Sequence, residues 1–200
     1  MSFFQNACKP TGIGGKIMVR LMNLGHASMA NWGFSHINIS EDAQVLDIGC
    51  GGGANIKKLL EKTPQGKVFG IDYSEVSVQQ SQSVNKAAIK NGRCEIIRAD
   101  AEKLPFEEDA FHCITAFETV YFWKDLDKCF QQVHRVLKTG GKFLICNELD
   151  GEIEQKWTDR IEGMQVYNGE TLVHHLKKVG FISIETDANE KGWLCIVAEK

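Results

Sequence analysis

The chain has 200 residues, of which 43% are hydrophobic and 24% are charged, and its formal net charge at pH 7 is -3. This length and balance predict a single domain over residues 1–200 with a sizeable core. The lysines are spread along the chain, which excludes the basic stripe typical of a nucleic-acid-binding protein. We therefore expect a protein that acts on small molecules. The sequence contains no apolar run long enough to span a membrane and no signal-peptide pattern, so we expect it to be cytoplasmic.

Seven cysteines are scattered along the chain, and no two of them form a Cys-x-x-Cys pair. An odd and dispersed set, mostly inside apolar stretches, favours reduced core thiols over a disulfide framework. The set also lacks the spacing of zinc ligands, so we expect no metal site.

Residues 1–40 are interpreted as an N-terminal lid segment. Residues 16–24 carry apolar side chains at helical spacing, which indicates a short helix. Residues 25–33 combine small residues with His26 and Trp32, a composition that predicts a loop folding over a ligand. The alternative is a covering segment that one tryptophan anchors.

Residues 45–48 predict a short strand that is buried on both faces, and a run of glycines follows it. The glycines at positions 49 to 53 tolerate positive φ and allow a ligand to approach the main chain, while Ala54 begins a helix whose free N–H groups face that ligand. This spacing also satisfies the dinucleotide fingerprint, so the glycines alone leave a nicotinamide-dependent enzyme open. Asp47 favours another ligand, because a carboxylate there repels a pyrophosphate and attracts an ammonium or sulfonium group.

At this point the chain resembles the Rossmann-like class I methyltransferases that use S-adenosylmethionine (SAM). Their first motif, acidic-x-Gly-x-Gly-x-Gly, is present here as Asp47-Ile48-Gly49-Cys50-Gly51-Gly52-Gly53. SAM carries both of the cations that Asp47 would attract. The resemblance implies a cofactor held at this turn and released as S-adenosylhomocysteine (SAH).

A second strand is expected over residues 67–71, and Asp72 ends it roughly 20 residues past the glycine turn. Nucleoside sites place at this position the acid that accepts hydrogen bonds from ribose hydroxyls. Tyr73 either lies along the adenine face or simply packs. Ser74 reads as the cap of a helix over residues 75–90.

A third strand is expected over residues 93–98, followed by Asp100-Ala101-Glu102-Lys103-Leu104-Pro105-Phe106. This segment is similar to the D-A-E-x-L-P-F segment of the same family, and the chain resembles its ubiquinone- and menaquinone-biosynthesis type. The resemblance implies that Asp100, with Ala101 and Glu102, receives the adenine amino group. A solvated acidic turn is the alternative.

Residues 111–117 predict another buried strand, with an aromatic cluster over residues 118–123 at its carboxyl end. Ligands of open α/β sheets lie beyond that edge of the strands, so the cluster is expected to face the transferred methyl group, or else to be ordinary core. It contains neither Asn-Pro-Pro-Tyr nor Asp-Pro-Pro-Tyr, which argues against methylation of an amide or adenine amino nitrogen by carbonyl clamping.

The last third of the chain predicts the remaining elements of the sheet. Asp125 is expected to cap a helix, and residues 138–141 are expected to turn into a strand over 142–146. The family resemblance implies that an amphipathic insertion over residues 147–168 walls the acceptor pocket. A helix over 170–179 then precedes two consecutive strands, 181–186 and 192–198, which pair antiparallel or lie apart because no helix connects them.

Together these elements predict an α/β fold, a Rossmann-like three-layer sandwich with a mostly parallel seven-stranded sheet and an antiparallel last strand. The expected activity is in-line methyl transfer from SAM to an unidentified small molecule. An NAD(P)-dependent oxidoreductase and a non-catalytic SAM-binding protein remain as alternatives. An acceptor that must lose a proton requires a general base, for which His26, Glu118 and Tyr121 are the candidates. The predicted cofactor-binding residues are Trp32, Asp47, Gly49, Cys50, Gly51, Gly53, Asp72, Tyr73, Ser74, Asp100, Ala101, Glu102 and Phe117.

Overall fold

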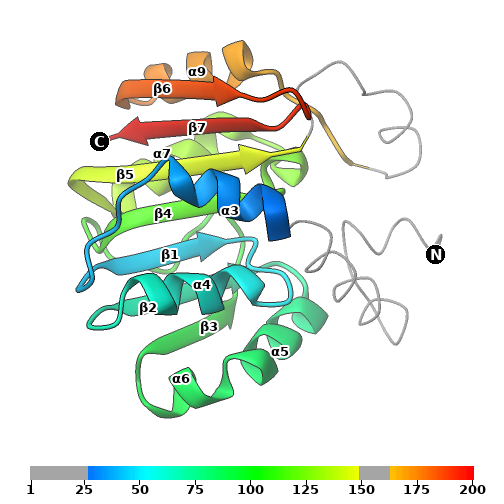
Figure 1. Cartoon of the computed structure of the whole chain (residues 1–200). Helices are drawn as coiled ribbons and strands as arrows, with labels where there is room; N and C mark the ends of the chain where they lie inside the picture. The colour runs from blue at the N-terminus through cyan, green and yellow to red at the C-terminus, as the bar shows by residue number, and fades with distance from the viewer. Residues whose placement is uncertain (1–26, 149–162) are drawn as a thin grey trace.

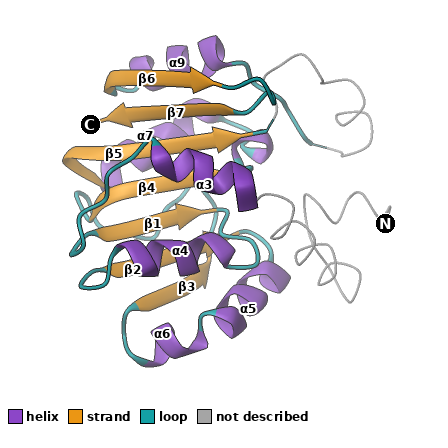
Figure 2. Cartoon of the chain, viewed as in Figure 1, coloured by secondary structure: helices purple, strands orange, loops and turns teal. Residues whose placement is uncertain are grey.

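The computed structural model describes residues 27–148 and 163–200. Within them, seven strands form one sheet in the order β3-β2-β1-β4-β5-β7-β6, with helices on both faces (Figure 1, Figure 2). Neighbouring strands from β3 to β5 run parallel, whereas β7 is antiparallel to both β5 and β6. The predicted sandwich with an antiparallel last strand is therefore confirmed.

Strands and helices alternate along the chain, as expected for a doubly wound sheet. The strands are β1 (Gln44–Ile48), β2 (Lys67–Asp72), β3 (Cys94–Arg98), β4 (Phe111–Phe117), β5 (Leu137–Asn147), β6 (Ile182–Ala188) and β7 (Leu194–Glu199). The helices are α3 (Ala27–Ser35), α4 (Ala54–Lys62), α5 (Glu75–Val84), α6 (Lys86–Lys90), α7 (Leu126–Val136), α9 (Gly169–Lys178) and the 3-10 helix η1 (Val120–Phe122). Because β1 to β5 are parallel, their carboxyl ends meet at one edge of the sheet, where ligands of such folds bind.

The sheet separates two apolar layers. In β4, Ile114 and Ala116 face the layer that contains α7 and α9, while Cys113 and Phe117 face the layer that contains α3 and α4. This follows from the alternation of side chains along a strand. Helix α7 begins after Asp125, whose side chain caps it as predicted, and it is amphipathic at helical spacing. Its buried residues are Leu126, Cys129, Phe130, Val133 and Val136.

Residues 27–35 form helix α3, so the prediction of a loop over residues 25–33 was wrong for this part. The prediction gave too much weight to small residues, whereas the buried side chains recur at helical spacing. Gly33 allows the helix to lie close to the sheet, since a Cβ there would be 2.8 Å from both Cys146 Sγ and a ring carbon of Phe117. The buried residues of α3 are Met29, Ala30, Gly33 and Phe34.

The helix predicted over residues 75–90 is divided at Asn85 into α5 and α6. Asn85 has non-helical backbone angles, φ -102° and ψ 18°. Its buried carboxamide donates hydrogen bonds to the carbonyl oxygens of Gly53 (3.1 Å) and Ser81 (3.0 Å). The break therefore connects this helix pair to the end of the glycine turn, a long-range contact that periodicity does not reveal.

Several predicted features lie outside the described residues: the helix over residues 16–24, His26, and residues 149–162 of the expected insertion. Among the helices that the structure describes, none is both long and apolar enough to cross a lipid bilayer. The six cysteines within the described ranges are free and buried, in agreement with the predicted core thiols.

Candidate cofactor-binding site

A glycine turn connects β1 directly to α4 at the carboxyl edge of the sheet (Figure 1). Gly49, Gly51 and Gly53 have φ values of 73°, 50° and 83°, the left-handed region that the sequence predicted for them. The N–H groups of Gly49 and Cys50 both donate to the Ile71 carbonyl, at 2.8 and 2.9 Å. These bonds fix the first half of the turn against β2.

The turn is packed at both ends, against Thr119 at Gly49 and against Asn85 and Ser81 at Gly53, and it is open in the middle. An ideal Cβ on Gly49 would lie 2.2 Å from Thr119 Oγ1, whereas one on Gly51 would meet only the Gly49 carbonyl oxygen, at 4.0 Å. Helix α4 follows Gly53 without a side-chain cap, which leaves its first N–H groups available. The main chain at Gly51 is therefore accessible to a ligand that also meets a helix N-terminus.

A pair of alanine substitutions separates the backbone conformation of Gly49 from its packing. Gly140 has the same φ of 73° and open space around it, so Gly140→Ala is expected to cost about 1–2 kcal/mol of stability for the left-handed conformation alone. Gly49→Ala adds the clash with Thr119, which overpacking data place at about 1–3 kcal/mol more. Denaturant unfolding of both variants measures this difference, and equal losses would contradict the packing of Thr119 on the turn.

Asp72 ends β2 and lies beside the glycine turn. Its Oδ2 accepts a hydrogen bond from the Gly51 N–H (2.9 Å), and its Oδ1 accepts one from the Ser74 N–H (2.8 Å). Burial raises the pKa of this carboxyl, and the two backbone donors oppose that effect. Each carboxylate oxygen can accept a further hydrogen bond, so Asp72 can hold the turn and still receive donors from a ligand.

Asp47 lies beneath the turn and is 2% exposed. Its Oδ1 accepts a hydrogen bond of 2.6 Å from the hydroxyl of Thr115, its neighbour on β4. Burial raises the pKa of Asp47 to about 7, the Thr115 hydroxyl opposes the shift, and the charge of Asp72 adds to it. A cation bound above the turn would stabilise the charged form of this carboxyl.

The residues predicted to meet adenine lie at the ends of β2 and β3. Tyr73 is 51% exposed, and the Arg98 guanidinium lies 5.7 Å from the centroid of its ring. Asp100 is exposed, and its Oδ1 accepts a hydrogen bond from the Glu102 N–H at 2.9 Å. Glu102 forms an ion pair of 3.0 Å with Lys128. The neighbouring Ala101 is partly buried.

Three other predicted cofactor residues have structural contacts. Ser74 caps α5 through a hydrogen bond from the Ser77 N–H. The Cys50 side chain is buried, and burial raises the pKa of its thiol. Phe117 is buried as well and packs on Phe34, with ring centroids 4.7 Å apart.

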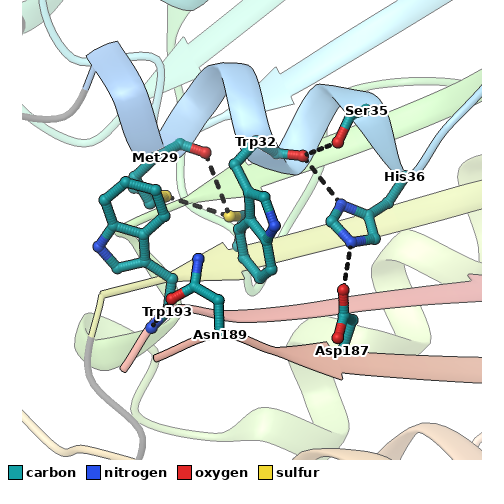
Figure 3. A network of polar contacts seen from close by, with 8 residues as sticks. Met29, Trp32, Ser35, His36, Asp187, Asn189 and Trp193 are labelled. Atoms are coloured by element: carbon teal, nitrogen blue, oxygen red, sulfur yellow. Dashed lines mark hydrogen bonds and ion pairs between the residues drawn. The ribbon is translucent and has the colours of Figure 1, made fainter. Parts of the chain in front are cut away.

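Trp32 lies on α3 and packs between that helix and the last two strands (Figure 3). Its ring centroid is 5.9 Å from that of Trp193 and 4.6 Å from that of His36. His36 in turn contacts the Trp32 carbonyl through Nδ1 and Asp187 through Nε2, both at 2.8 Å. These contacts fasten α3 to the end of β6 and the start of β7.

Glu118 follows β4 with a φ of 56°, a conformation that non-glycine residues seldom adopt. Its Oε1 accepts hydrogen bonds from the Tyr121 hydroxyl (3.1 Å) and from the Glu148 N–H. Burial raises the pKa of the Glu118 carboxyl to about 8. The next residue, Thr119, packs on Gly49, so Glu118 lies close to the glycine turn.

The aromatic residues after Glu118 are largely core. Tyr121 is 2% exposed and Trp123 is 5% exposed. Trp123 stacks on Phe143 with a centroid separation of 6.4 Å. The structure therefore supports the core alternative for these two rings. The Tyr121 hydroxyl nevertheless donates a hydrogen bond to Glu118, a candidate catalytic residue.

Burial of Asp47 and Glu118 makes stability depend on pH in a defined direction. Their folded pKa values of about 7 and 8 exceed the ordinary 3.8 and 4.5, so the folded state holds these protons more tightly. Their contribution to stability is full below pH 4 and is lost as the pH rises through 7 to 8. The stability of Asp47→Asn and of Glu118→Gln, each relative to the wild type, should therefore increase when the pH is raised from 5.5 to 8.5. Denaturant midpoints at both pH values check this, and a gap that does not change with pH would contradict it.

Sequence reasoning missed three residues that support the site. Thr115 bonds Asp47, Thr119 packs on Gly49, and Asn85 bonds the Gly53 carbonyl. A polar threonine inside an otherwise apolar strand and an asparagine inside a helix were the available signals. Among the residues that the structure describes, no group of three His, Cys, Asp or Glu side chains is placed to hold a metal ion.

Comparison with known proteins shows which family the chain is similar to. Residues 39–193 match the family described as methyltransferase domain. Cycloartenol-C-24-methyltransferase 1 of Oryza sativa subsp. japonica is 28% identical over 109 residues, which cover 54% of this chain and 31% of that protein. Arginine-hydroxylase NDUFAF5, mitochondrial, of Mus musculus is 29% identical over 157 residues, covering 72% of this chain and 44% of that protein.

A solved structure shares the fold over most of the chain. It is the putative methyltransferase in complex with the Haloferax volcanii Trm112 methyltransferase activator. It has a TM-score of 0.82 at 20% identity and covers 91% of this chain and 93% of its own. The match spans only about a third of the length of three curated relatives, the two cycloartenol-C-24-methyltransferases and a sterol 4-C-methyltransferase.

Proposed function

This chain belongs to the family of methyltransferase domains, and from that membership we propose that it transfers the methyl group of SAM to a small-molecule acceptor. The enzyme class predicted from the sequence, a SAM-dependent methyltransferase, is confirmed at the level of the family, and SAM is the cofactor of that class. The observation that carries the proposal is the open main chain at Gly51 beside the Asp72 carboxylate.

The residues present fit SAM. Asp72 would accept hydrogen bonds from the ribose hydroxyls, and Asp100 would receive the adenine amino group. Asp47 would place a negative charge beneath the cationic part of the cofactor. The exposed Tyr73 ring would lie along adenine, and the glycine turn would allow close approach of the main chain. Trp32 is left out of this proposal, because its ring packs on His36 and Trp193 on the β7 and β6 side of the sheet.

SAM supplies an electrophilic methyl group on a positively charged sulfur. The reaction cancels that charge, so the main task of the protein is to align donor and acceptor, which can contribute roughly 7–11 kcal/mol. Glu118 is the candidate proton acceptor, because it lies next to the residue that packs on Gly49 and its raised pKa makes it a stronger base. When the acceptor carries a proton, that proton moves to a Glu118 carboxylate oxygen. Tyr121 orients this carboxyl through its hydroxyl.

Titration calorimetry with SAM, SAH and NADH tests the proposal. We expect SAM and SAH to bind and NADH not to bind, because the Asp47 carboxylate beneath the turn disfavours a pyrophosphate there. Tight binding of NADH without SAM would instead support the oxidoreductase alternative.

A screen of metabolites for acceptor-dependent release of SAH tests the catalytic part separately. A relative named arginine-hydroxylase carries a similar domain, so binding of SAM does not by itself establish methyl transfer. Release of SAH with one class of acceptor would support the proposal. Binding of SAM without release for any acceptor would favour the non-catalytic alternative.

A further inference from the structure

Thr115 is a polar residue in the middle of the buried strand β4, and its hydroxyl bonds the Asp47 carboxyl. Thr115 and Asp47 are register partners on adjacent parallel strands. The Thr115 Oγ1 and Asp47 Oδ1 are 2.6 Å apart, and the two residues are 0% and 2% exposed. A carboxylate can only accept, so in the charged state of Asp47 the hydroxyl is the donor of a short, charge-assisted hydrogen bond.

The remaining surroundings of Asp47 offer little to stabilise a negative charge. On the β2 side its register partner is Gly70, which has no side chain. The titratable groups that face it are Asp72 from the end of β2, Cys50 from the turn and Cys113 from β4, all acidic or neutral. Over residues 27–148 and 163–200, no lysine, arginine or histidine forms an ion pair with Asp47.

We propose that Thr115 is a positioning residue of the cofactor site, whose hydroxyl keeps the Asp47 carboxylate in the charged form that attracts the cationic cofactor. This inference rests on the proposed function. Without the hydroxyl, the buried carboxylate loses its donor and takes up a proton, since an unpartnered buried charge is costly. A neutral Asp47 side chain no longer attracts a sulfonium or ammonium group.

The sign of the pH dependence follows from linkage. A cationic ligand binds the charged form of Asp47 more tightly, so SAM affinity should rise as the pH rises through the pKa of this carboxyl, which is about 7. The Thr115 hydroxyl lowers that pKa, so its removal should move the rise in affinity to higher pH. A purely structural role would instead weaken binding by the same factor at every pH.

The experiment measures SAM dissociation constants by calorimetry between pH 5.5 and 9 for the wild type and three variants. Thr115→Val keeps the volume without the hydroxyl, and we expect at least tenfold weaker binding than the wild type at pH 7 that recovers toward pH 9. Thr115→Ser keeps the hydroxyl and should follow the wild-type profile. Asp47→Asn should bind weakly and should lack the rise near pH 7 that Asp47 produces. Infrared difference spectra should show loss of a protonated carboxyl on SAM binding in the Thr115→Val variant at pH 7.

The outcomes separate this inference from the function on which it rests. If the wild type binds SAM and the affinity of Thr115→Val changes with pH in parallel with that of the wild type, only the role of Thr115 is overturned. A Thr115→Ser profile displaced as far as that of Thr115→Val would overturn it too. Absence of SAM binding by the wild type at every pH would overturn the proposed function and this inference together.

Discussion

Replacing Asp72 by alanine is expected to weaken SAM binding by at least about a hundredfold. The carboxylate is proposed to accept hydrogen bonds from two ribose hydroxyls, and bonds to a charged group contribute roughly 1.5–3 kcal/mol each. The same side chain also bonds the Gly51 N–H, so its loss loosens the turn that meets the cofactor. Calorimetric titration with SAM measures the change.

Glu95→Ala provides the matched control for Asp72→Ala. Glu95 lies on the neighbouring strand β3, forms an ion pair with Lys67 at 3.0 Å, and carries the same charge. Its loss should leave SAM affinity near the wild-type value. A hundredfold loss in both variants would indicate a general electrostatic effect, and wild-type affinity in Asp72→Ala would contradict a ribose-binding role.

Replacing Glu118 by glutamine is expected to lower kcat by about a hundredfold to ten-thousandfold while leaving SAM affinity unchanged. The amide keeps an oxygen for the Tyr121 hydroxyl and the Glu148 N–H but cannot take a proton. The measurement uses the acceptor that the metabolite screen identifies. Full activity of Glu118→Gln would exclude this residue as the base.

Tyr121→Phe tests the surroundings of Glu118 without removing the base. The Tyr121 hydroxyl lowers the pKa of the Glu118 carboxyl, so its loss should raise that pKa further. Since the base acts in its ionised form, the rise of kcat with pH should move to higher pH in the variant. An unchanged pH profile would show that the tyrosine does not act through Glu118.

Local sequence was sufficient for the parts of the fold that a few adjacent residues determine. The β1 turn is one case, because Gly49, Gly51 and Gly53 adopt a positive φ, although Gly52, which the same expectation included, does not. Asp72 is another, since its place at the end of β2 follows from the strand that precedes it. The antiparallel last strand was also predictable, because no helix separates β6 from β7.

Contacts between distant residues were not predictable in the same way. Thr115 and Asp47 are 68 positions apart, and only the pairing of β1 with β4 brings them together. Asn85 interrupts a helix because it bonds the Gly53 carbonyl, 32 positions earlier. Helix α3 was mistaken for a loop because of its small residues, one of which, Gly33, provides close approach to the sheet.

A crystal structure of the protein with SAH bound would show where the nucleoside lies. We expect the nucleoside at the glycine turn, with the ribose hydroxyls within hydrogen-bonding distance of Asp72 and the main chain of Gly51 in contact with the ligand. A nucleoside bound elsewhere on the molecule, or bound at this edge of the sheet with Asp72 left out of contact, would contradict it.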